Sequence, residues 1–291
     1  MDIESGNNLN EHIRVNTENI EKVLTSEYFI VHCDSGIETY LRQDDAEKID
    51  DIKIYLDKTL GVDSNFEEQK IKAYLFSNKE RYLEFMQKNY PNVPDGSATF
   101  DQKTNSVFAY SPADIKEYRG ILGDDILTDQ EVENIIRGRI FSIVAHESAH
   151  LHSPFNGVGN EDSKNKWEQE MICTFLEDKT SLKFDEKFDE NIKRQAREYL
   201  ANLQSDNEIF SWEEAGAKWD DFTKAERLVY SWLEKQYGLK KLQDLWSKMF
   251  KDKRTISEAV KEVYEKDIHH LEEEFQNEML SSKKLFRKIE K

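Results

Sequence analysis

The spacing of apolar residues changes along the chain, from short alternating runs in the first half to a period of three and four in the second. In the first half, runs rich in β-branched and aromatic residues predict strands at Tyr28–Cys33 and Ile71–Phe76. Helical periodicity lies between and after them, at residues 37–60 and at Ser77–Lys88, where Ser77 is the expected N-cap. These patterns predict an α+β half with a small, mainly antiparallel sheet. A hairpin is expected around DQKTN, with strands at Ser97–Phe100 and Ser106–Tyr110.

The second half of the chain is helical in pattern throughout. Thr255 and Glu258 form a capping box before its last predicted helix. The expected organisation is a polar lead-in at residues 1–25, an α/β half at 26–180, and an α-helical half at 181–291 that closes over it. The helices predicted in the last part are Asn191–Leu203, Thr223–Tyr237, Leu239–Phe250 and Ile256–Met279.

One helix is predicted in most detail, from Thr128 to just before Pro154. Thr128 and Glu131 form a capping box, in which each side chain satisfies a backbone N–H group of the other residue. Apolar residues then recur at spacings of three and four, until Pro154 prevents the helix from continuing. Such a helix is largely buried, so polar side chains in its last turns need partners. Its apolar positions are Ile135, Ile136, Ile140, Ile143 and Val144.

The last turns of this helix contain the segment His146-Glu147-Ser148-Ala149-His150, an HExxH motif. Histidines four residues apart project from one face of a helix, so both imidazoles can bind one Zn²⁺ ion. Glu147 stands between them, where its carboxylate can take a proton from a metal-bound water. In a chain with seven histidines and many acids, chance gives such a motif on the order of one time in fifty. The helical context therefore favours a zinc site over two histidines that are simply buried.

A catalytic zinc ion needs a third protein ligand, and Glu170 is the candidate. It follows His150 by twenty residues, in a helical segment whose apolar residues recur every four positions. The intervening loop contains one proline and two glycines, which allow the chain to reverse its direction. Two antiparallel helices joined in this way would place Glu170 opposite the two histidines.

Two other assignments of the third ligand are open. Glu213 or Glu214, in SWEEAGAKW, also lies near Trp, Gly and Ala residues, but more than sixty residues from His150. His152 lies two residues from His150, and this spacing turns its side chain to another face of the helix. Glu170 is the preferred ligand.

HExxH followed by a glutamate on the next helix resembles the signature of the gluzincin metallopeptidases, with the thermolysin-like spacing of twenty residues. The flanking sequence looks most like the bacterial peptidase-MA-like domains, in which the second motif is roughly WLxEGLAxYLE; here it is WEQEMICTFLE. The resemblance runs from about Tyr28 to Leu280. It implies a zincin-like fold, a Zn²⁺ ion held by His146, His150 and Glu170, and peptidase activity.

This chain departs from the family pattern at several positions. The family's Gly and Ala after the ligand glutamate are Met171 and Cys173, and Thr174 stands where the thermolysin-like branch has an aspartate. The tyrosine that the family pattern uses as a donor to the oxyanion corresponds to Phe222. Tyr230, one to two turns later, is the candidate substitute, although a tyrosine in LVYSWL is more often a core residue.

The resemblance also implies how a substrate would bind. In gluzincins a strand next to the motif helix borders the cleft and pairs with the substrate backbone, and Val107–Tyr110 is the expected strand. The alternative is an ordinary edge strand. The acids near Gly123-Asp124-Asp125 do not form a convincing site for a substrate ammonium group, so an endopeptidase is slightly preferred to an aminopeptidase.

The predicted function is that of a zinc-dependent metallopeptidase, in which Glu147 takes the proton of the attacking water and gives one to the leaving amine. The alternative is a catalytically inactive zincin-like domain that binds zinc or a protein partner. The presence of Glu147 favours the enzyme, because a structural metal site needs no base. The absence of the family's tyrosine favours the inactive domain.

The composition of the chain limits the classes of partner that it can bind. The chain has 291 residues, enough for a sizeable core, and a net charge of −18 argues against a nucleic acid or an anionic membrane as partner. A peptide or protein substrate is expected instead.

No apolar run approaches a membrane span, and the polar N-terminus lacks a signal-peptide core. The sequence as written predicts a cytoplasmic protein, and removal of a leader would make it secreted or cell-surface. Cys33 and Cys173 are expected to be small core residues without a disulfide.

Overall fold

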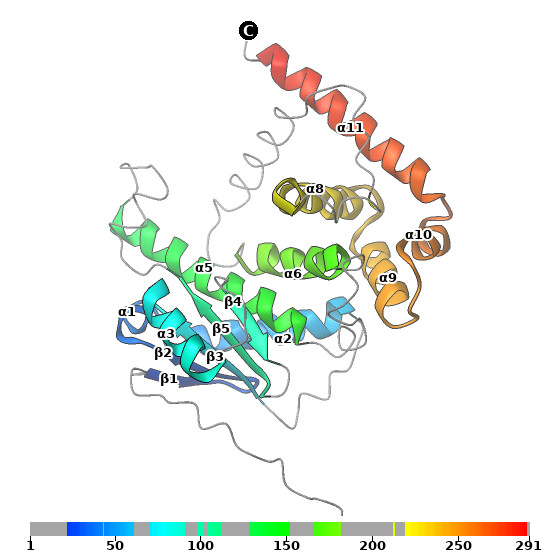
Figure 1. Ribbon diagram of the computed structural model, residues 1–291. Helices are drawn as coiled ribbons and strands as arrows, with labels where there is room; N and C mark the ends of the chain where they lie inside the picture. Colours follow the sequence, from blue (N-terminus) through cyan, green and yellow to red (C-terminus); the bar gives the residue numbers. More distant parts are fainter. Residues whose placement is uncertain are drawn as a thin grey trace, which may run out of the picture.

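The structure, a computed structural model, describes residues 22–42, 44–60, 70–90, 98–101, 104–111, 128–151, 166–181, 212 and 219–289. A five-stranded sheet lies at one end of the molecule and helices fill the rest, most of them from the second half of the chain (Figure 1). The predicted α+β class is confirmed. The strands are β1 (Lys22–Thr25), β2 (Phe29–Cys33), β3 (Ile71–Phe76), β4 (Ala98–Asp101) and β5 (Ser106–Tyr110). The helices are α1 (Ser35–Glu38), α2 (Asp45–Leu60), α3 (Lys79–Asn89), α5 (Asp129–His150), α6 (Lys166–Ser181), α8 (Trp219–Tyr237), α9 (Leu239–Phe250), α10 (Ile256–Tyr264) and α11 (Ile268–Ile289).

The sheet is mixed, with the strand order β1-β2-β3-β5-β4. The three central strands run parallel, and each outer strand is antiparallel to its neighbour. Parallel neighbours need a crossover connection, and α2 and α3 lie in the connections that follow β2 and β3. The predicted hairpin is present as β4 and β5. The small sheet therefore contains parallel and antiparallel pairings in equal number.

The strand β5 has no edge to offer to a substrate, so the prediction for Val107–Tyr110 is wrong. It pairs with β3 on one side and with β4 on the other. The last strand at this end of the described sheet is β4. A peptide that added to the sheet here would pair with β4 instead.

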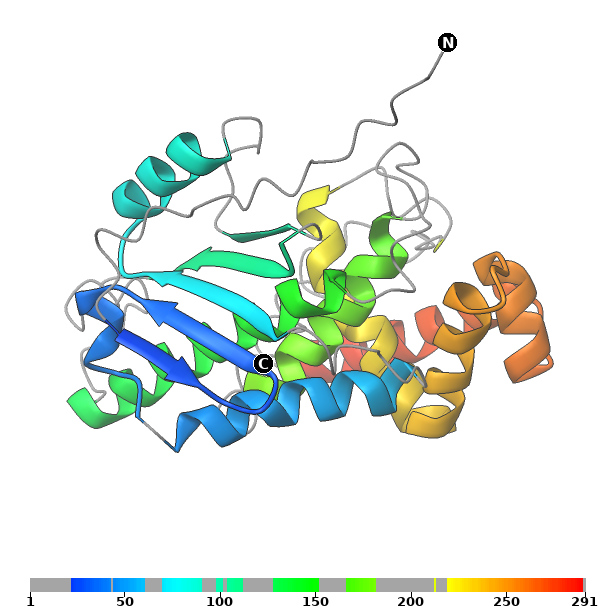
Figure 2. The same cartoon turned by 90° about the horizontal axis from the view of Figure 1, so that it is seen from below.

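Helices cover both faces of the sheet, because successive side chains of each strand point to opposite faces. On one face an aromatic cluster joins β3 and β5 to α3, and the rings of Tyr74 and Phe108 stack with their centroids 5.2 Å apart. The opposite face belongs to the main core and lies against α2 and α5. Figure 2 shows α3 on one side of the sheet and α2 and α5 on the other.

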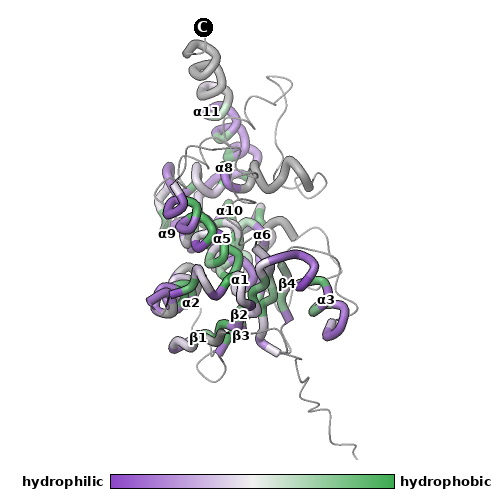
Figure 3. Tube along the Cα trace, turned by 90° about the vertical axis from the view of Figure 1, so that its left-hand side faces the viewer, coloured by the Kyte–Doolittle hydropathy of each residue, from purple (hydrophilic) through white to green (hydrophobic). Residues whose placement is uncertain are grey.

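The helix α5 lies at the centre of the fold. Its first turn is exposed and carries the predicted capping box, in which the Thr128 backbone N–H donates to Glu131 Oε2 at 2.8 Å. From Ile136 onward nearly every residue is buried, because the sheet packs on one side of α5 and α6 packs on another. In Figure 3 the hydrophobic colouring runs along α5, whereas α3 at the surface is largely hydrophilic. The helices α6, α8 and α11 follow α5 in successive layers (Figure 1).

The helix α3 begins one residue later than predicted. Asn78 is its N-cap and accepts a hydrogen bond from the Arg81 backbone N–H. Ser77 is engaged elsewhere, since its backbone N–H and its hydroxyl both donate to Asp34 Oδ2, at 2.9 and 2.8 Å. A tertiary contact, which the local sequence does not reveal, thus moves the cap.

Other helices also differ from the predicted bounds. The predicted segment 37–60 contains α1 and α2, and Ile256–Met279 is divided into α10 and α11 at Glu265, whose φ of 58° ends the first helix. The capping box of Thr255 and Glu258 is present. The predicted helix Asn191–Leu203 and most of the lead-in at residues 1–25 lie outside the described residues. Within the described ranges, no helix combines the length and the apolar character that crossing a bilayer requires.

Candidate metal centre

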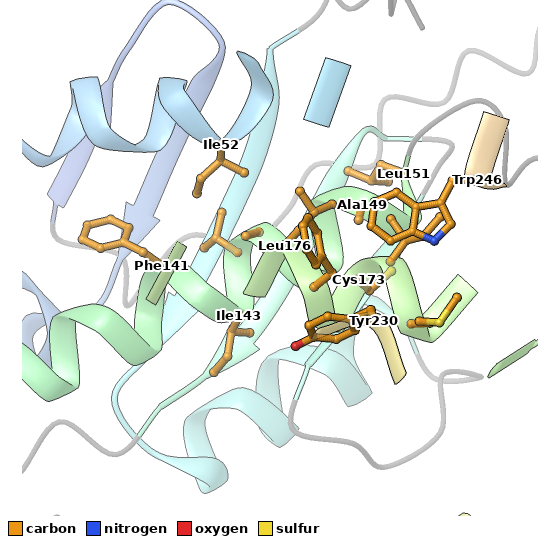
Figure 4. Packing of buried hydrophobic residues seen from close by; sticks show 14 of the residues in the cluster. Ile52, Phe141, Ile143, Ala149, Leu151, Cys173, Leu176, Tyr230 and Trp246 are labelled. Carbon is orange, nitrogen blue, oxygen red and sulfur yellow. The ribbon is translucent and has the colours of Figure 1, made fainter. Parts of the chain in front are cut away.

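The predicted site lies between α5 and α6, which run side by side in opposite directions. Arg139, in the middle of α5, pairs with Glu177 near the end of α6, whereas His150 at the end of α5 lies near Glu170 at the start of α6. This is the antiparallel arrangement that the sequence predicts. The core between and around these helices includes Ile143 and Ala149 of α5 and Cys173 and Leu176 of α6 (Figure 4).

The side chains of His146, His150 and Glu170 converge. Glu170 Oε2 lies 3.2 Å from His146 Nε2 and 3.7 Å from His150 Nε2. Ligand atoms around a tetrahedral zinc ion, each about 2.0–2.1 Å from the metal, stand roughly 3.3 Å apart. The two separations are close to that value, so one carboxylate oxygen is already a common partner of both imidazole Nε2 atoms. The residues present fit a zinc ion.

The second nitrogen of His146 contacts a carboxylate that was not predicted. His146 Nδ1 lies 3.2 Å from Glu177 Oε2. When a histidine Nδ1–H donates to a carboxylate, the ring is held in place and Nε2 is left as the nitrogen that binds a metal. Glu177 follows Glu170 by seven residues, about two helical turns, and this spacing on one face is the signal that could have identified it.

Two arginines hold Glu177. Arg139 Nη1 lies 2.6 Å from Glu177 Oε1, and Arg227 Nη2 lies 3.6 Å from the same oxygen. Arg227 belongs to α8, and its Nε also lies 3.1 Å from Asp178 Oδ1. Burial raises the pKa of Asp178 to about 7, although Arg227 acts in the opposite direction. The third layer of the fold is thus linked to the histidines through ion pairs.

The charges in the site are mutually dependent. Burial lowers the pKa of His146, but hydrogen bonds to Glu170 and Glu177 outweigh it and hold this pKa well above its usual range. Burial raises the pKa of the Glu170 carboxyl group, yet hydrogen bonds to His146 and His150 bring this pKa well below its usual range. For Glu177, Arg139 and then His146 outweigh burial in the same way and lower the pKa of its carboxyl group. Arg139 and Arg227 balance the charge of Glu177, so Glu170 is the ionised carboxylate beside the histidines whose charge a bound cation would balance.

Glu147, the predicted base, is buried on α5 next to the first histidine, with 8% of its surface exposed. Burial raises the pKa of its carboxyl group, while the nearby charges of His146 and His150 lower it, and the net shift is upward. A carboxylate with a raised pKa is a stronger proton acceptor near neutral pH.

Tyr230, the predicted oxyanion donor, lies in the core. It is 2% exposed and lies among the buried residues drawn in Figure 4. Its ring packs edge-on against Phe175 of α6 at a centroid distance of 5.1 Å. Its hydroxyl makes no hydrogen bond within the described part of the chain. These are the contacts of a packing residue, and the role of Tyr230 as a donor stays a prediction. The side chain of Phe222 and residues His152, Glu213 and Glu214 lie outside the description.

The strand β4 reaches the site. Phe100 stacks on the ring of His150, with centroids 5.0 Å apart and planes at 13°. The last strand of the described sheet therefore runs beside the second histidine of the motif.

Cys173 is a further donor near the histidines. Its Sγ atom and one ring nitrogen of each of His146 and His150 lie within 4.8 Å of one another. The predicted burial of both cysteines is confirmed, since each is 0% exposed. The histidine pair can thus be completed from α6 in two ways, through Glu170 or through Cys173. Glu170 Oε2 lies within 3.7 Å of an imidazole nitrogen of each histidine, and we take it as the third ligand.

The sequence was compared with models of known protein families and with curated proteins, and neither comparison gave a match. The resemblance to gluzincins therefore rests on the motifs alone, and the function is argued from the chemistry of the site.

Replacement of Glu177 tests the support of His146. Glu177→Gln is expected to weaken zinc binding by about 10- to 100-fold, because the neutral amide holds the imidazole less firmly and leaves Arg139 without its carboxylate. Zinc affinity is measured by competition with a chromophoric chelator. The control is Glu234→Gln, which removes another carboxylate that links α6 and α8, through Lys179 at 2.8 Å. Equal affinities for the two variants would show that Glu177 does not support the site.

Proposed function

We propose that this protein is a zinc-dependent metallopeptidase of the gluzincin type, a hydrolase of peptide bonds. The observation that carries the proposal is the approach of His146 Nε2 and His150 Nε2 to one oxygen of Glu170, with Glu147 on the same helix as the histidines. Two imidazoles and one carboxylate form a known catalytic zinc set, and three protein ligands leave one position for water or substrate.

Each residue of the site has a role in this proposal. His146, His150 and Glu170 hold the zinc ion, and Glu177 keeps the ring of His146 oriented through Nδ1. A zinc ion bound there supplies a Lewis acid that polarises a peptide carbonyl and lowers the pKa of water. Glu147 accepts the proton of the attacking water and delivers it to the leaving amine. Burial of Glu147 supports this role, because a raised pKa makes the transfer to and from its carboxyl group easier.

The substrate in this proposal is a peptide or protein segment in an extended conformation. The contact between Phe100 and His150 supports β4 as the strand along which the backbone of the substrate lies. An endopeptidase remains the preferred type, and Gly123-Asp124-Asp125 lies outside the described residues.

A second candidate function is metal binding without turnover. The burial of Tyr230 favours it, since its hydroxyl makes no hydrogen bond to the histidines or to Glu147 within the described part of the chain. The zinc site itself is common to both functions, and Glu147 distinguishes them.

Metal content is the first test of the site. Protein supplied with zinc and then freed of excess metal is expected to contain one zinc ion per chain by elemental analysis. Glu170→Ala is expected to weaken zinc binding by more than about 100-fold. Loss of a residue that only supports a ligand weakens metal binding by up to that factor, and Glu170→Ala removes a ligand itself. The matched control is Glu133→Ala, on α5 but near its first turn, which is expected to bind zinc normally.

Native protein that stays free of metal after zinc has been supplied would contradict the proposal. If Glu170→Ala binds zinc as tightly as native protein, the protein has a zinc site but Glu170 is not its third ligand.

A further inference from the structure

A fourth protein donor is available at the histidines, and the family resemblance does not account for it. Cys173 follows Glu170 by three residues, so both side chains lie on the same side of α6. The family pattern has alanine at this position. Here the sulfur and one nitrogen of each histidine lie within 4.8 Å of one another. We propose that Cys173 is a fourth ligand of the metal and that it occupies the coordination position otherwise open to water. This inference rests on the zinc site proposed above.

The geometry permits this coordination. In a tetrahedral zinc site with bonds of about 2.3 Å to sulfur and 2.0–2.1 Å to nitrogen, the sulfur and the nitrogen stand roughly 3.5 Å apart. The separations at Cys173 are at most 4.8 Å, so the sulfur and each nitrogen need to approach by no more than about 1.3 Å, which side-chain rotation can provide. The three side chains come from α5 and α6, two helices that pack against each other.

The donor chemistry and the charge balance favour the same conclusion. A thiolate is a soft ligand, and a site that contains one prefers zinc or cobalt to magnesium, calcium or manganese. One carboxylate and one thiolate together neutralise the two positive charges of the ion. Glu177, the other carboxylate beside His146, already has Arg139 and Arg227 as partners. When Cys173 coordinates, its S–H bond breaks, a sulfur–metal bond forms and the proton passes to solvent.

Coordination by Cys173 changes what the site can do. Two histidines, Glu170 and Cys173 fill all four positions of a tetrahedral ion, which is the pattern of closed rather than catalytic zinc sites. Water or substrate then gains access only when the thiolate leaves the metal. Cys173 would thus act as an internal brake on the hydrolysis proposed above.

Cobalt substitution tests this inference directly. A thiolate bound to Co²⁺ gives an intense charge-transfer absorption in the near ultraviolet, which imidazole and carboxylate ligands do not give. We expect this band in native protein loaded with Co²⁺ and in Cys33→Ala, and its complete loss in Cys173→Ser. Cys33 is an equally buried cysteine at the end of β2 and serves as the matched control. Because the chain has two cysteines, a band in Cys33→Ala assigns the ligand to Cys173 even if Cys173→Ser does not fold.

The outcomes separate this inference from the proposed function. If native protein binds one equivalent of Co²⁺ without the band, Cys173 is not a ligand and the three-ligand zinc site stands. If no Co²⁺ or Zn²⁺ binds, the proposed function fails and this inference fails with it. A brake also predicts that zinc-loaded Cys173→Ser hydrolyses peptides faster than native protein. If Cys173→Ser loses the band but hydrolyses peptides no faster than native protein, Cys173 is a metal ligand but does not inhibit hydrolysis.

Discussion

Glu147→Gln is expected to lower peptide hydrolysis by roughly 10²- to 10⁴-fold and to leave zinc bound. Glutamine keeps the shape of the side chain and can still accept a hydrogen bond, but it cannot take up the proton of the attacking water. Glu147 is not among the donors that converge on Glu170, so zinc content should remain at one ion per chain. Hydrolysis is measured with zinc-loaded protein on an unstructured protein substrate and on a mixed peptide library, with kcat and KM determined separately.

The control for this substitution lies on the same helix. Glu133→Gln replaces a carboxylate about 21 Å away along the axis of α5, and hydrolysis should be unchanged. Activity that survives in Glu147→Gln would remove Glu147 as the base. If neither native protein nor Cys173→Ser hydrolyses anything in the library although each carries one zinc ion, the second candidate, a metal-binding domain without turnover, is favoured.

The parts of the fold that the sequence predicted well are those determined by residues close together in the chain. The strand Ile71–Phe76 is found with the predicted bounds, and the capping boxes at Thr128 and Thr255 are present, because a strand pattern and a cap each depend on a few neighbouring residues. The order of the strands depends on pairings between distant segments. The predicted role of Val107–Tyr110 was wrong for this reason, since the partner on each side of β5 cannot be read from β5 itself.

In the candidate site, too, the residues that local spacing determines were predicted, except Glu177, and those that distant segments contribute were not. His146 and His150 were predictable because one helical period places them on one face. Glu170 required one further step, the reversal of the chain between two helices. Glu177 had a local signal, its spacing of about two helical turns from Glu170 on the same face of α6. Arg227 comes from α8, and no spacing in the sequence connects it with α6.

The ion pairs around the site indicate how the fold tolerates so many buried charges. An unpaired buried charge is strongly unfavourable, so each must have a partner of opposite sign. Arg139 and Arg227 form ion pairs with Glu177, and Glu177 in turn pairs with His146. Because α5, α6 and α8 each contribute to this network, their packing and the position of the histidine ring are coupled. A variant that removes one of these charges is therefore expected to affect both stability and metal binding.

The largest effect on stability is expected at a different ion pair on the same central helix. Asp45, in the first turn of α2, pairs with Arg137 of α5, and it also accepts a hydrogen bond from the Arg42 backbone N–H at 2.8 Å. Asp45 is 0% exposed and the Arg137 side chain 9%. Asp45→Ala is expected to lower the free energy of unfolding by about 3–5 kcal/mol, because it leaves the guanidinium buried without a counter-charge.

Urea denaturation of the metal-free protein measures this effect without a contribution from zinc binding. The control is Asp244→Ala, which breaks an exposed pair with Lys240 on α9 and should cost less than about 1 kcal/mol. The double variant Asp45→Leu with Arg137→Met should recover much of the loss, since it removes both charges and keeps the volume apolar. If Asp45→Ala costs no more than Asp244→Ala, the pair does not fasten α2 to α5. If the cost is large and the double variant does not recover it, the hydrogen bonds from the Arg42 backbone and from Lys48 Nζ, rather than the pair with Arg137, are the main contribution of Asp45.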